Sequence, residues 1–236
     1  MAAWTHVVAD VLFPRDCAGC DGPLGVGHAS WLCTACWREL RTPFTPCIRC
    51  GIPVAPPLIT CVACARRPPV FDAARALGLY LAGPGKLNPL ARAVRALKYR
   101  GHRGVAASFG HAMAERLVPP CDGIVVPVPL HRARLRERGY DQAALLARAL
   151  ARRAGLPIAL RGLVRRRATV SQAELDAEAR RANLRGAFVA TVAPGGRPVV
   201  LVDDVLTTGA TADACARALR AAGAGAVLVL TVGRTP

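Results

Sequence analysis

Two groups of residues in this sequence have the types and spacing that chemistry requires: paired cysteines near the start and an acidic, threonine-rich segment near the end. Of the ten cysteines, eight lie in the first 64 residues and form Cys-x-x-Cys pairs. A two-residue gap lets both sulfurs of one pair turn toward the same ion, and two pairs complete a tetrahedral thiolate site. The pattern therefore predicts one or two structural zinc ions. The predicted ligands are Cys17, Cys20, Cys33, Cys36, Cys47, Cys50, Cys61 and Cys64.

Other uses of these cysteines fit the sequence less well. A disulfide framework needs an oxidising compartment, and residues 1–10 lack the charged start and cleavage site of a secretory signal. A thioredoxin-like site needs one such pair after a strand, not four in series. Sequential sites, one in residues 17–36 and one in residues 47–64, are the preferred pairing, and an interleaved cross-brace is the alternative. Cys121 and Cys215 are expected to be small buried apolar residues.

The acidic segment begins with four apolar residues, Val199–Val202, which predict a strand buried on both faces. Asp203 and Asp204 follow, and their carboxylates can accept hydrogen bonds from sugar hydroxyls. Backbone N–H groups of the next turn can bind a phosphate at the positive end of a helix. A simple strand, acidic turn and threonine cap would explain the turn but not its combination with paired acids. The residues of this turn are Thr207, Thr208, Gly209, Ala210 and Thr211.

The elements that must position these groups follow from apolar periodicity. Strands are predicted over residues 74–81, 123–129, 158–163, 186–190, 199–202 and 226–232, and helices over 87–99, 105–117, 141–154 and 210–222. Strands that alternate with helices predict a three-layer α/β fold with a mainly parallel sheet, which binds ligands beyond the carboxyl ends of its strands. The Arg-Arg-Pro-Pro stretch at 66–69 predicts a linker between a cysteine module, residues 1–69, and an α/β domain, residues 70–236. A short amphipathic helix is predicted over residues 4–12.

Two basic segments could bind a pyrophosphate, because arginine recognises phosphate groups bidentately. His131, Arg134 and Arg138 follow the strand predicted at 123–129, and Arg166 and Gln172 lie in a polar connection, residues 165–185. His131 is expected to be a hydrogen-bonding loop residue rather than a base. A solvated basic loop is the alternative for the first segment.

The net charge of +17 favours polyanions such as nucleic acid or phosphorylated metabolites, although an arginine-rich composition alone could produce it. Aromatic residues make up only 5% of the chain, which argues against a dedicated base-stacking surface. Trp31 and Trp37 are the best stacking candidates, but packing in a small core is the preferred interpretation for both. No apolar run reaches the roughly 18 residues of a membrane span. We expect no membrane insertion and a cytoplasmic location.

The acidic segment resembles the phosphoribosyl pyrophosphate (PRPP) signature of type I phosphoribosyltransferases, and nearly the whole chain resembles the ComF family. The resemblance is carried by the paired cysteines, residues 97–99 (Leu-Lys-Tyr), 126–131, 138–142, 172–183 and 203–209. It implies that PRPP and Mg²⁺ bind at Asp203, Asp204 and the turn 207–211, with pyrophosphate leaving toward Arg134 and Arg138. It also implies that the connection containing Arg166 and Gln172 is a mobile loop that closes over PRPP.

The same resemblance implies a link to natural competence, DNA uptake or nucleotide salvage, with single-stranded DNA and a DNA-uptake helicase as further partners. Two functions stay open. In the first, the chain is a phosphoribosyltransferase with an unknown acceptor, and the acids support the ribose as positive charge develops on it. In the second, it is a non-catalytic binder of single-stranded DNA that uses PRPP as a regulatory ligand. One departure is Asp141, where the family usually has asparagine, and an acid there could pair with Arg138.

Overall fold

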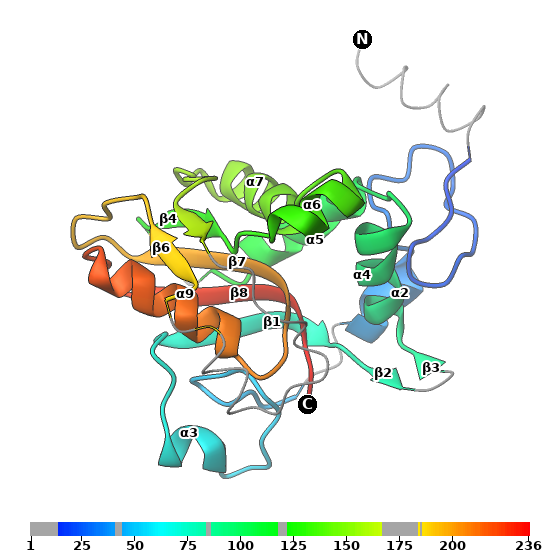
Figure 1. Ribbon diagram of the computed structural model, residues 1–236. Coiled ribbons are helices and arrows are strands. Elements are labelled where there is room, and N and C mark those ends of the chain that lie inside the picture. The colour runs from blue at the N-terminus through cyan, green and yellow to red at the C-terminus, as the bar shows by residue number, and fades with distance from the viewer. Residues whose placement is uncertain (1–13, 41–43, 84–85, 118–121, 167–183, 185) are drawn as a thin grey trace.

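A parallel sheet forms the centre of the computed structural model, which describes residues 14–40, 44–83, 86–117, 122–166, 184 and 186–236. The sheet has four strands in the order β1-β8-β7-β4, and every neighbouring pair is parallel (Figure 1). This confirms the predicted α/β class with a mainly parallel sheet. The strands are β1 (Ala73–Leu79), β4 (Ile124–Pro127), β7 (Val199–Leu206) and β8 (Val227–Arg234).

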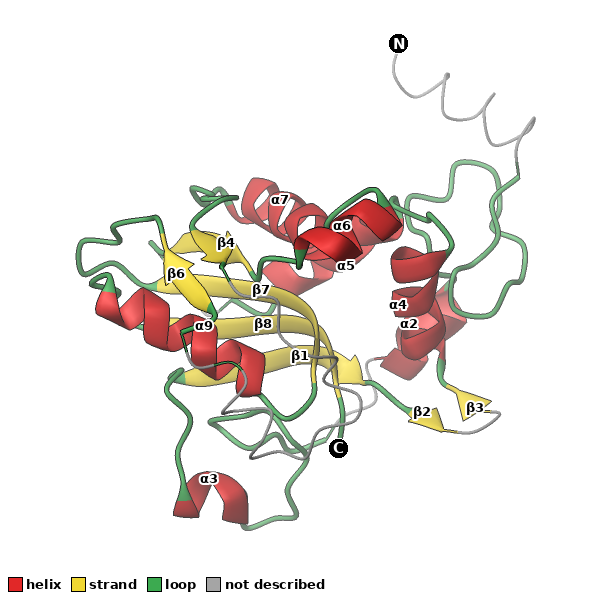
Figure 2. Cartoon of the chain, in the orientation of Figure 1, coloured by secondary structure: helices red, strands yellow, loops and turns green. Residues whose placement is uncertain are grey.

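Helices cover both faces of this sheet and complete three layers (Figure 2). Apolar periodicity explains why these helices form, as α4 (Pro89–Tyr99) shows. In this helix Leu90, Val94 and Leu97 recur at helical spacing and are all fully or almost fully buried. The Asn88 side chain caps its start by accepting a hydrogen bond from Ala91 N at 3.0 Å. One face carries α4 (Pro89–Tyr99), α5 (Val105–Ala114) and α7 (Gln142–Ala154), and the other carries α9 (Ala210–Ala221).

Two sequence-based expectations about the sheet's surroundings are wrong. The strand predicted over 158–163 does not form, and Ile158 makes only a single bridge to Val125. A turn closed by Gly162 N and Ala159 O interrupts it, and the next strand belongs to a separate two-stranded antiparallel sheet. The basic segment after β4 is a helix rather than a loop. The smaller elements are α2 (Thr34–Leu40), α3 (Val62–Arg66), β2 (Ala82–Gly83), β3 (Lys86–Leu87), α6 (Arg132–Arg138), β5 (Leu163–Arg165) and β6 (Phe188–Ala190).

The two halves of the cysteine-rich region lie on opposite faces of the sheet (Figure 1). The first cysteine module, residues 15–40, shares the apolar core of α4 and α5, and Trp31 N donates to Ser108 Oγ of α5 at 3.0 Å. The second cysteine module, residues 44–66, packs on the α9 face. There Ala74 N of β1 donates to Arg49 O at 2.6 Å, and Cys50 packs against the α9-side core.

Some predictions fall on residues that the structure does not describe: the helix over 4–12, Cys121, and Gln172 with most of the connection 165–185. Cys215 is completely buried in α9, as predicted. In the described part of the chain, no helix has the length and apolar character needed to cross a bilayer.

Candidate functional site

Each cysteine module brings four sulfurs together. The sulfurs of a group all lie within 4.8 Å of one another. Cys17 Sγ is 3.6 Å from Cys36 Sγ, and Cys50 Sγ is 3.7 Å from Cys61 Sγ. A tetrahedral zinc ion with Zn–S bonds of about 2.3 Å holds its sulfurs roughly 3.8 Å apart, so the spacing fits zinc. The groups are sequential, not interleaved: Cys17, Cys20, Cys33 and Cys36 in one, Cys47, Cys50, Cys61 and Cys64 in the other.

The backbone around Cys47 of the second group favours its thiolate form. Burial raises the pKa of the Cys47 thiol, but the N–H groups of Cys50, Cys61 and Arg49 outweigh this effect and lower that pKa to about 6. The Cys61 N–H lies 3.3 Å from Cys47 Sγ. Because thiolate is the form that binds metal, and because four cysteines leave no open coordination position, these centres suit structural zinc.

The acidic segment continues the strand farther than predicted. Strand β7 runs to Leu206, so both acids belong to it. Successive side chains of a strand point to opposite faces. Leu201 packs in the core on the α9 face and Val202 in the core on the α4 face. The side chains of Asp203 and Asp204 therefore belong to the α9 face and the α4 face respectively, and the two acids are not equivalent.

Asp204 is buried inside the protein, with 4% of its surface exposed. Its Oδ1 lies 2.7 Å from Lys98 Nζ of α4, and its Oδ2 accepts a hydrogen bond from Gln142 Nε2 of α7 at 2.9 Å. Burial alone lowers the pKa of Lys98, but the Asp204 carboxylate outweighs it and the pKa is raised, so the pair is ionic.

Lys98 and Gln142 were not predicted as site residues, although both lie in motifs that carry the family resemblance. A signal for Lys98 was present: it follows the buried Val94 by four residues, which places it on the apolar side of α4. A lysine on that side needs a buried acid as its partner. Gln142 is the first residue of α7 and is 5% exposed, and helical periodicity alone gives no reason for its burial.

Asp203 is partly exposed at the end of β7 and is not paired in the same way. Its Oδ1 accepts a hydrogen bond from Asp204 N at 2.8 Å. Burial and the neighbouring Asp204 charge raise the pKa of Asp203 to about 8. A cation that binds this carboxylate near neutral pH must therefore displace a proton.

The threonine turn, residues 207–211, connects β7 to α9, and within it Ala210 N donates to Thr208 Oγ1 at 3.4 Å. Gly209 is the N-cap of α9 with φ +80°, a left-handed conformation that favours glycine. No side chain caps the helix at this residue. Thr207 and Thr208 are exposed. Uncapped N–H groups at the positive end of a 12-residue helix make this turn suitable for a phosphate.

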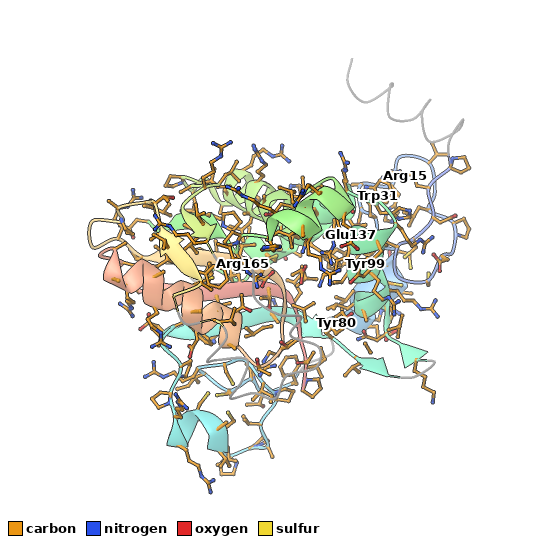
Figure 3. All side chains as sticks on the ribbon, in the orientation of Figure 1. Arg15, Trp31, Tyr80, Tyr99, Glu137 and Arg165 are labelled. Carbon is orange, nitrogen blue, oxygen red and sulfur yellow. The ribbon has the colours of Figure 1, made fainter. Side chains whose placement is uncertain are left out.

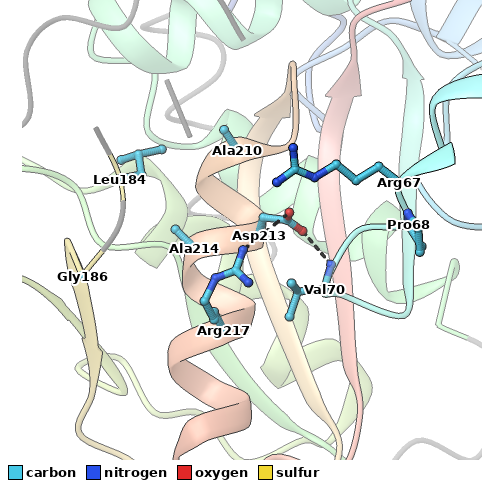
Figure 4. Close-up of a pocket in the computed structure, with 9 residues that line it drawn as sticks. All are labelled: Arg67, Pro68, Val70, Leu184, Gly186, Ala210, Asp213, Ala214 and Arg217. Carbon is cyan, nitrogen blue, oxygen red and sulfur yellow. Dashed lines mark hydrogen bonds and ion pairs between the residues drawn. The ribbon is translucent and has the colours of Figure 1, made fainter. Parts of the chain in front are cut away.

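Two cavities adjoin the threonine turn, so it is neither blocked nor remote from a cleft. A cavity of about 330 Å³ separates it from the second cysteine module and is lined by Thr208, Gly209, Phe71 and Arg234, among others. A second, of about 370 Å³, runs along α9 and is shown in Figure 4. Its walls include Arg67, Arg217 and Asp213, and the Asp213 carboxylate accepts a hydrogen bond from Val70 N at 2.8 Å.

The predicted pyrophosphate residues of the first basic segment lie on or beside α6. His131 caps this helix, because its Nδ1 accepts a hydrogen bond from Ala133 N at 3.3 Å. Arg134 is exposed and forms an ion pair with Glu137 at 3.1 Å. Arg166 is exposed at the end of β5. The structure thus brings His131 and Arg134 together and places Arg166 on another element.

Arg138 and Asp141 do not pair with each other. The Arg138 guanidinium lies over the Tyr99 ring, 5.0 Å from its centroid, and donates to the Tyr99 hydroxyl at 3.4 Å. Tyr99 is the last residue of α4 and is labelled in Figure 3. Asp141 instead caps α7 by accepting from Ala144 N at 3.0 Å, and it also accepts from Leu130 N. Asparagine caps helices equally well, so the departure at this position preserves the local structure.

Trp31 and Trp37 are packing residues, which is the interpretation that the sequence favoured over base stacking. Trp37 meets the Phe109 ring edge-on, and its Nε1 donates to Ser30 Oγ at 2.8 Å. Trp31 fills the space beside Gly104, where an added Cβ would lie 2.2 Å from the indole nitrogen. Among the described aromatic residues, Tyr99 is the most exposed, with 62% of its surface open to solvent.

Comparison with known proteins finds similarity along nearly the whole chain. A family model described as a double zinc ribbon domain matches residues 8–70. The DNA utilization protein YhgH of Escherichia coli K12 is 32% identical over 230 residues, covering 94% of this chain and 98% of that protein. YhgH of Salmonella typhi is 31% identical with the same coverage. Competence protein F of Haemophilus influenzae is 29% identical over 231 residues, covering 92% and 96%.

Proposed function

Because the chain belongs to the ComF family, we propose that it binds PRPP at Asp203 and the threonine turn and serves competence-linked DNA use or nucleotide salvage. The observation that carries this proposal is the uncapped start of α9. Its amides, the exposed hydroxyls of Thr207 and Thr208, and the Asp203 carboxylate all adjoin the carboxyl end of one central strand. That is where parallel sheets bind ligands.

Each part of PRPP has a chemical match among these residues. The 5′-phosphate binds the amides of the threonine turn, and the ribose hydroxyls donate to Asp203. Mg²⁺ prefers carboxylate and phosphate oxygens, and its chemistry here is to neutralise the charge of the pyrophosphate group. Asp204 remains bonded to Lys98 and Gln142 and keeps β7 fixed between α4 and α7. Arg134 and Arg138 on α6 supply positive charge for pyrophosphate.

As a phosphoribosyltransferase, the protein would use Asp203 to support the ribose as positive charge develops at its anomeric carbon. The acceptor is a nucleobase or a nucleic-acid group. A cell that degrades imported DNA supplies both, which connects this chemistry to the names of the relatives. Arg166 and Gln172 complete the proposal as residues of the loop that excludes water from the ribose.

A second function, binding of single-stranded DNA with PRPP as a regulatory ligand, is favoured by the pair of Tyr99 and Arg138. An exposed ring beneath a guanidinium offers a stacking surface next to positive charge, and each stacked base contributes about 1–3 kcal/mol. Helix α6 adds four arginines and no buried residue. This surface adjoins Lys98, so bound DNA would lie near the proposed PRPP site. A DNA-uptake helicase remains a proposed protein partner, for which the cysteine modules are the candidate surface.

Calorimetric titration with PRPP and Mg²⁺ tests the shared part of both functions. The wild-type chain should bind, and Asp203→Asn should weaken binding at least about tenfold, a change of roughly 1.4 kcal/mol. Asp21→Asn is the matched control, because it removes the same charge from an exposed ion pair on the first cysteine module. Absence of binding, or equal binding in Asp203→Asn, would remove the proposal. Pyrophosphate release on adding a nucleobase or single-stranded DNA then separates the transferase from the regulated binder.

A further inference from the structure

Arg234, the last residue of β8, is a buried cation that touches two functional regions at once. It is 6% exposed. Its Nε donates to the carbonyl of Cys50 in the second cysteine module at 2.9 Å. Its Nη1 donates to the carbonyl of Leu206 at 3.1 Å and to that of Thr207 at 2.6 Å. One guanidinium therefore joins a predicted metal ligand to the start of the threonine turn.

These contacts determine how the turn presents its amides. A carbonyl and the N–H of the following residue share one rigid peptide plane. The Leu206 carbonyl also accepts a hydrogen bond from Thr235 N at 3.1 Å, so Arg234 acts on the turn mainly through the Thr207 carbonyl. Holding that carbonyl toward Arg234 also fixes the N–H group of Thr208, which points away from it and belongs to the proposed phosphate site. The same guanidinium lines the cavity of about 330 Å³ that lies between this turn and the second cysteine module.

The charge of Arg234 also requires an explanation. A buried guanidinium is costly without an opposite charge nearby. Within the described residues its hydrogen-bond partners are carbonyl and hydroxyl oxygens, and no carboxylate lies at ion-pair distance. Four thiolates around one Zn²⁺ leave a net negative charge on the centre. Because Cys50 belongs to that group of four, a loaded second site supplies the missing counter-charge.

We propose that Arg234 is a positioning residue that couples zinc in the second cysteine module to the threonine turn, so that the turn is ordered for an anion only while that zinc is bound. Loss of the metal frees the Cys50 backbone, removes the counter-charge and loosens the guanidinium, and the turn amides lose their common direction. The effect of this coupling on ligand affinity rests on the proposed function. The coupling between zinc in the second cysteine module and the threonine turn does not depend on that function.

The first cysteine module provides the contrast. Its contacts lead to α4 and α5, through Trp31 to Ser108 and through an ion pair of 2.9 Å between Asp21 and Arg100. In the described structure none of its hydrogen bonds reaches the threonine turn. Metal loss there should disturb the α4 side of the core and leave the turn amides as they are.

Hydrogen exchange of the full chain, read on peptides that cover residues 203–211, tests the coupling without any ligand. Three variants are compared with wild type: Cys61→Ser with Cys64→Ser, which empties the second site; Arg234→Met; and their combination. Zinc content is measured for each. We expect exchange of the hydrogen-bonded amides in these peptides, such as Ala210 N bonded to Thr208 Oγ1, to accelerate at least about tenfold in the first two variants. The combination should add nothing further, because both changes act through one connection. Additive effects, or wild-type exchange in Arg234→Met, would overturn the proposal.

Arg75→Met is the matched control. Arg75 also donates from the sheet to the second module, to Ile48 O at 3.1 Å, but it does not reach the turn, so exchange there should not change. If the cysteine variant fails to fold, chelation of zinc from the wild-type chain replaces it. Arg234→Lys adds a further test, because it keeps the charge but lacks the fork that spans Cys50 and the turn. The amides of residues 203–211 should exchange as fast in Arg234→Lys as in Arg234→Met. Exchange at the wild-type rate in Arg234→Lys would contradict the bridging role.

PRPP affinity is then measured on the same proteins. If wild type binds PRPP, Arg234→Met should bind at least about tenfold more weakly. If wild type does not bind, the proposed function fails, while the exchange data still decide whether metal and turn are coupled.

Discussion

Lys98 Nζ lies 2.7 Å from Asp204 Oδ1, an ion pair that joins the last turn of α4 to the end of β7 beneath the proposed site. Only 19% of the lysine side chain and 6% of the aspartate side chain are exposed. A pair this buried contributes little net stability, but removal of one partner leaves an uncompensated charge. The pair therefore fixes where the strand end lies relative to α4.

The first prediction is that Lys98→Met lowers the free energy of unfolding by about 3–5 kcal/mol at neutral pH. Urea denaturation measures this. Asp21→Asn breaks an exposed pair with Arg100 and should cost no more than about 1 kcal/mol. A loss of under about 1 kcal/mol in Lys98→Met would show that Asp204 is not held as the structure shows.

The second prediction concerns pH. The pKa of Asp203 is about 8 in the folded chain, against roughly 3.9 for an unfolded aspartate. Between those values the folded chain binds a proton that the unfolded chain has lost. This group's contribution to the free energy of unfolding therefore falls as pH rises from about 4 to 8 and is constant above that. Asp203→Asn should remove this slope in urea denaturation series at several pH values, and an identical slope in the variant would contradict the shift.

The same shift predicts that affinity for PRPP with Mg²⁺ increases with pH up to about 8, because the ligand needs the ionised carboxylate. Calorimetry at neutral pH in buffers of different ionisation enthalpy should show a proton released on binding, and Asp203→Asn should release less.

The features that could be predicted from the sequence are those whose residues lie close together along the chain. The spacing of the four cysteine pairs predicts both groups of metal ligands, because the four cysteines of each group lie within about twenty residues of one another in the sequence. The strand, acids, threonine turn and helix from Val199 to Ala221 are consecutive, and the structure has them in that order. The predicted strand ended too early, because Asp203 and Asp204 are polar residues that nevertheless belong to β7 near its carboxyl end.

What could not be read depends on contacts between distant segments. Asp204 meets Lys98 and Gln142, which lie 106 and 62 residues earlier in the chain, and local periodicity says nothing about such pairs. Arg234 has no local sequence signal for burial, yet it is buried and bonded to the carbonyl of Cys50 in the second cysteine module. Helix α6 was missed because it buries no residue and so has no apolar stripe.

The third prediction concerns zinc. The wild-type chain should contain two zinc ions. Changing Cys47, Cys50, Cys61 and Cys64 together to serine should leave one, because the sequential group in the first module stays complete. An interleaved pairing would lose both. Elemental analysis of the purified proteins decides between these results.

The fourth prediction separates base stacking from phosphate contact. Tyr99→Ala should weaken binding of single-stranded DNA by about 1–3 kcal/mol without changing its salt dependence. Arg134→Gln should reduce the slope of log affinity against log salt by about 0.7, the value for one phosphate on a single strand. Fluorescence anisotropy across a salt series measures both. Equal affinity in all three proteins would exclude this surface as the DNA site.

A crystal structure of the chain with PRPP and Mg²⁺ would show whether the threonine turn is the phosphate site. We expect electron density for the 5′-phosphate within hydrogen-bond distance of the amides of the threonine turn, and for the ribose against the Asp203 carboxylate. Density for PRPP elsewhere on the molecule, or an empty turn at saturating ligand, would contradict this expectation.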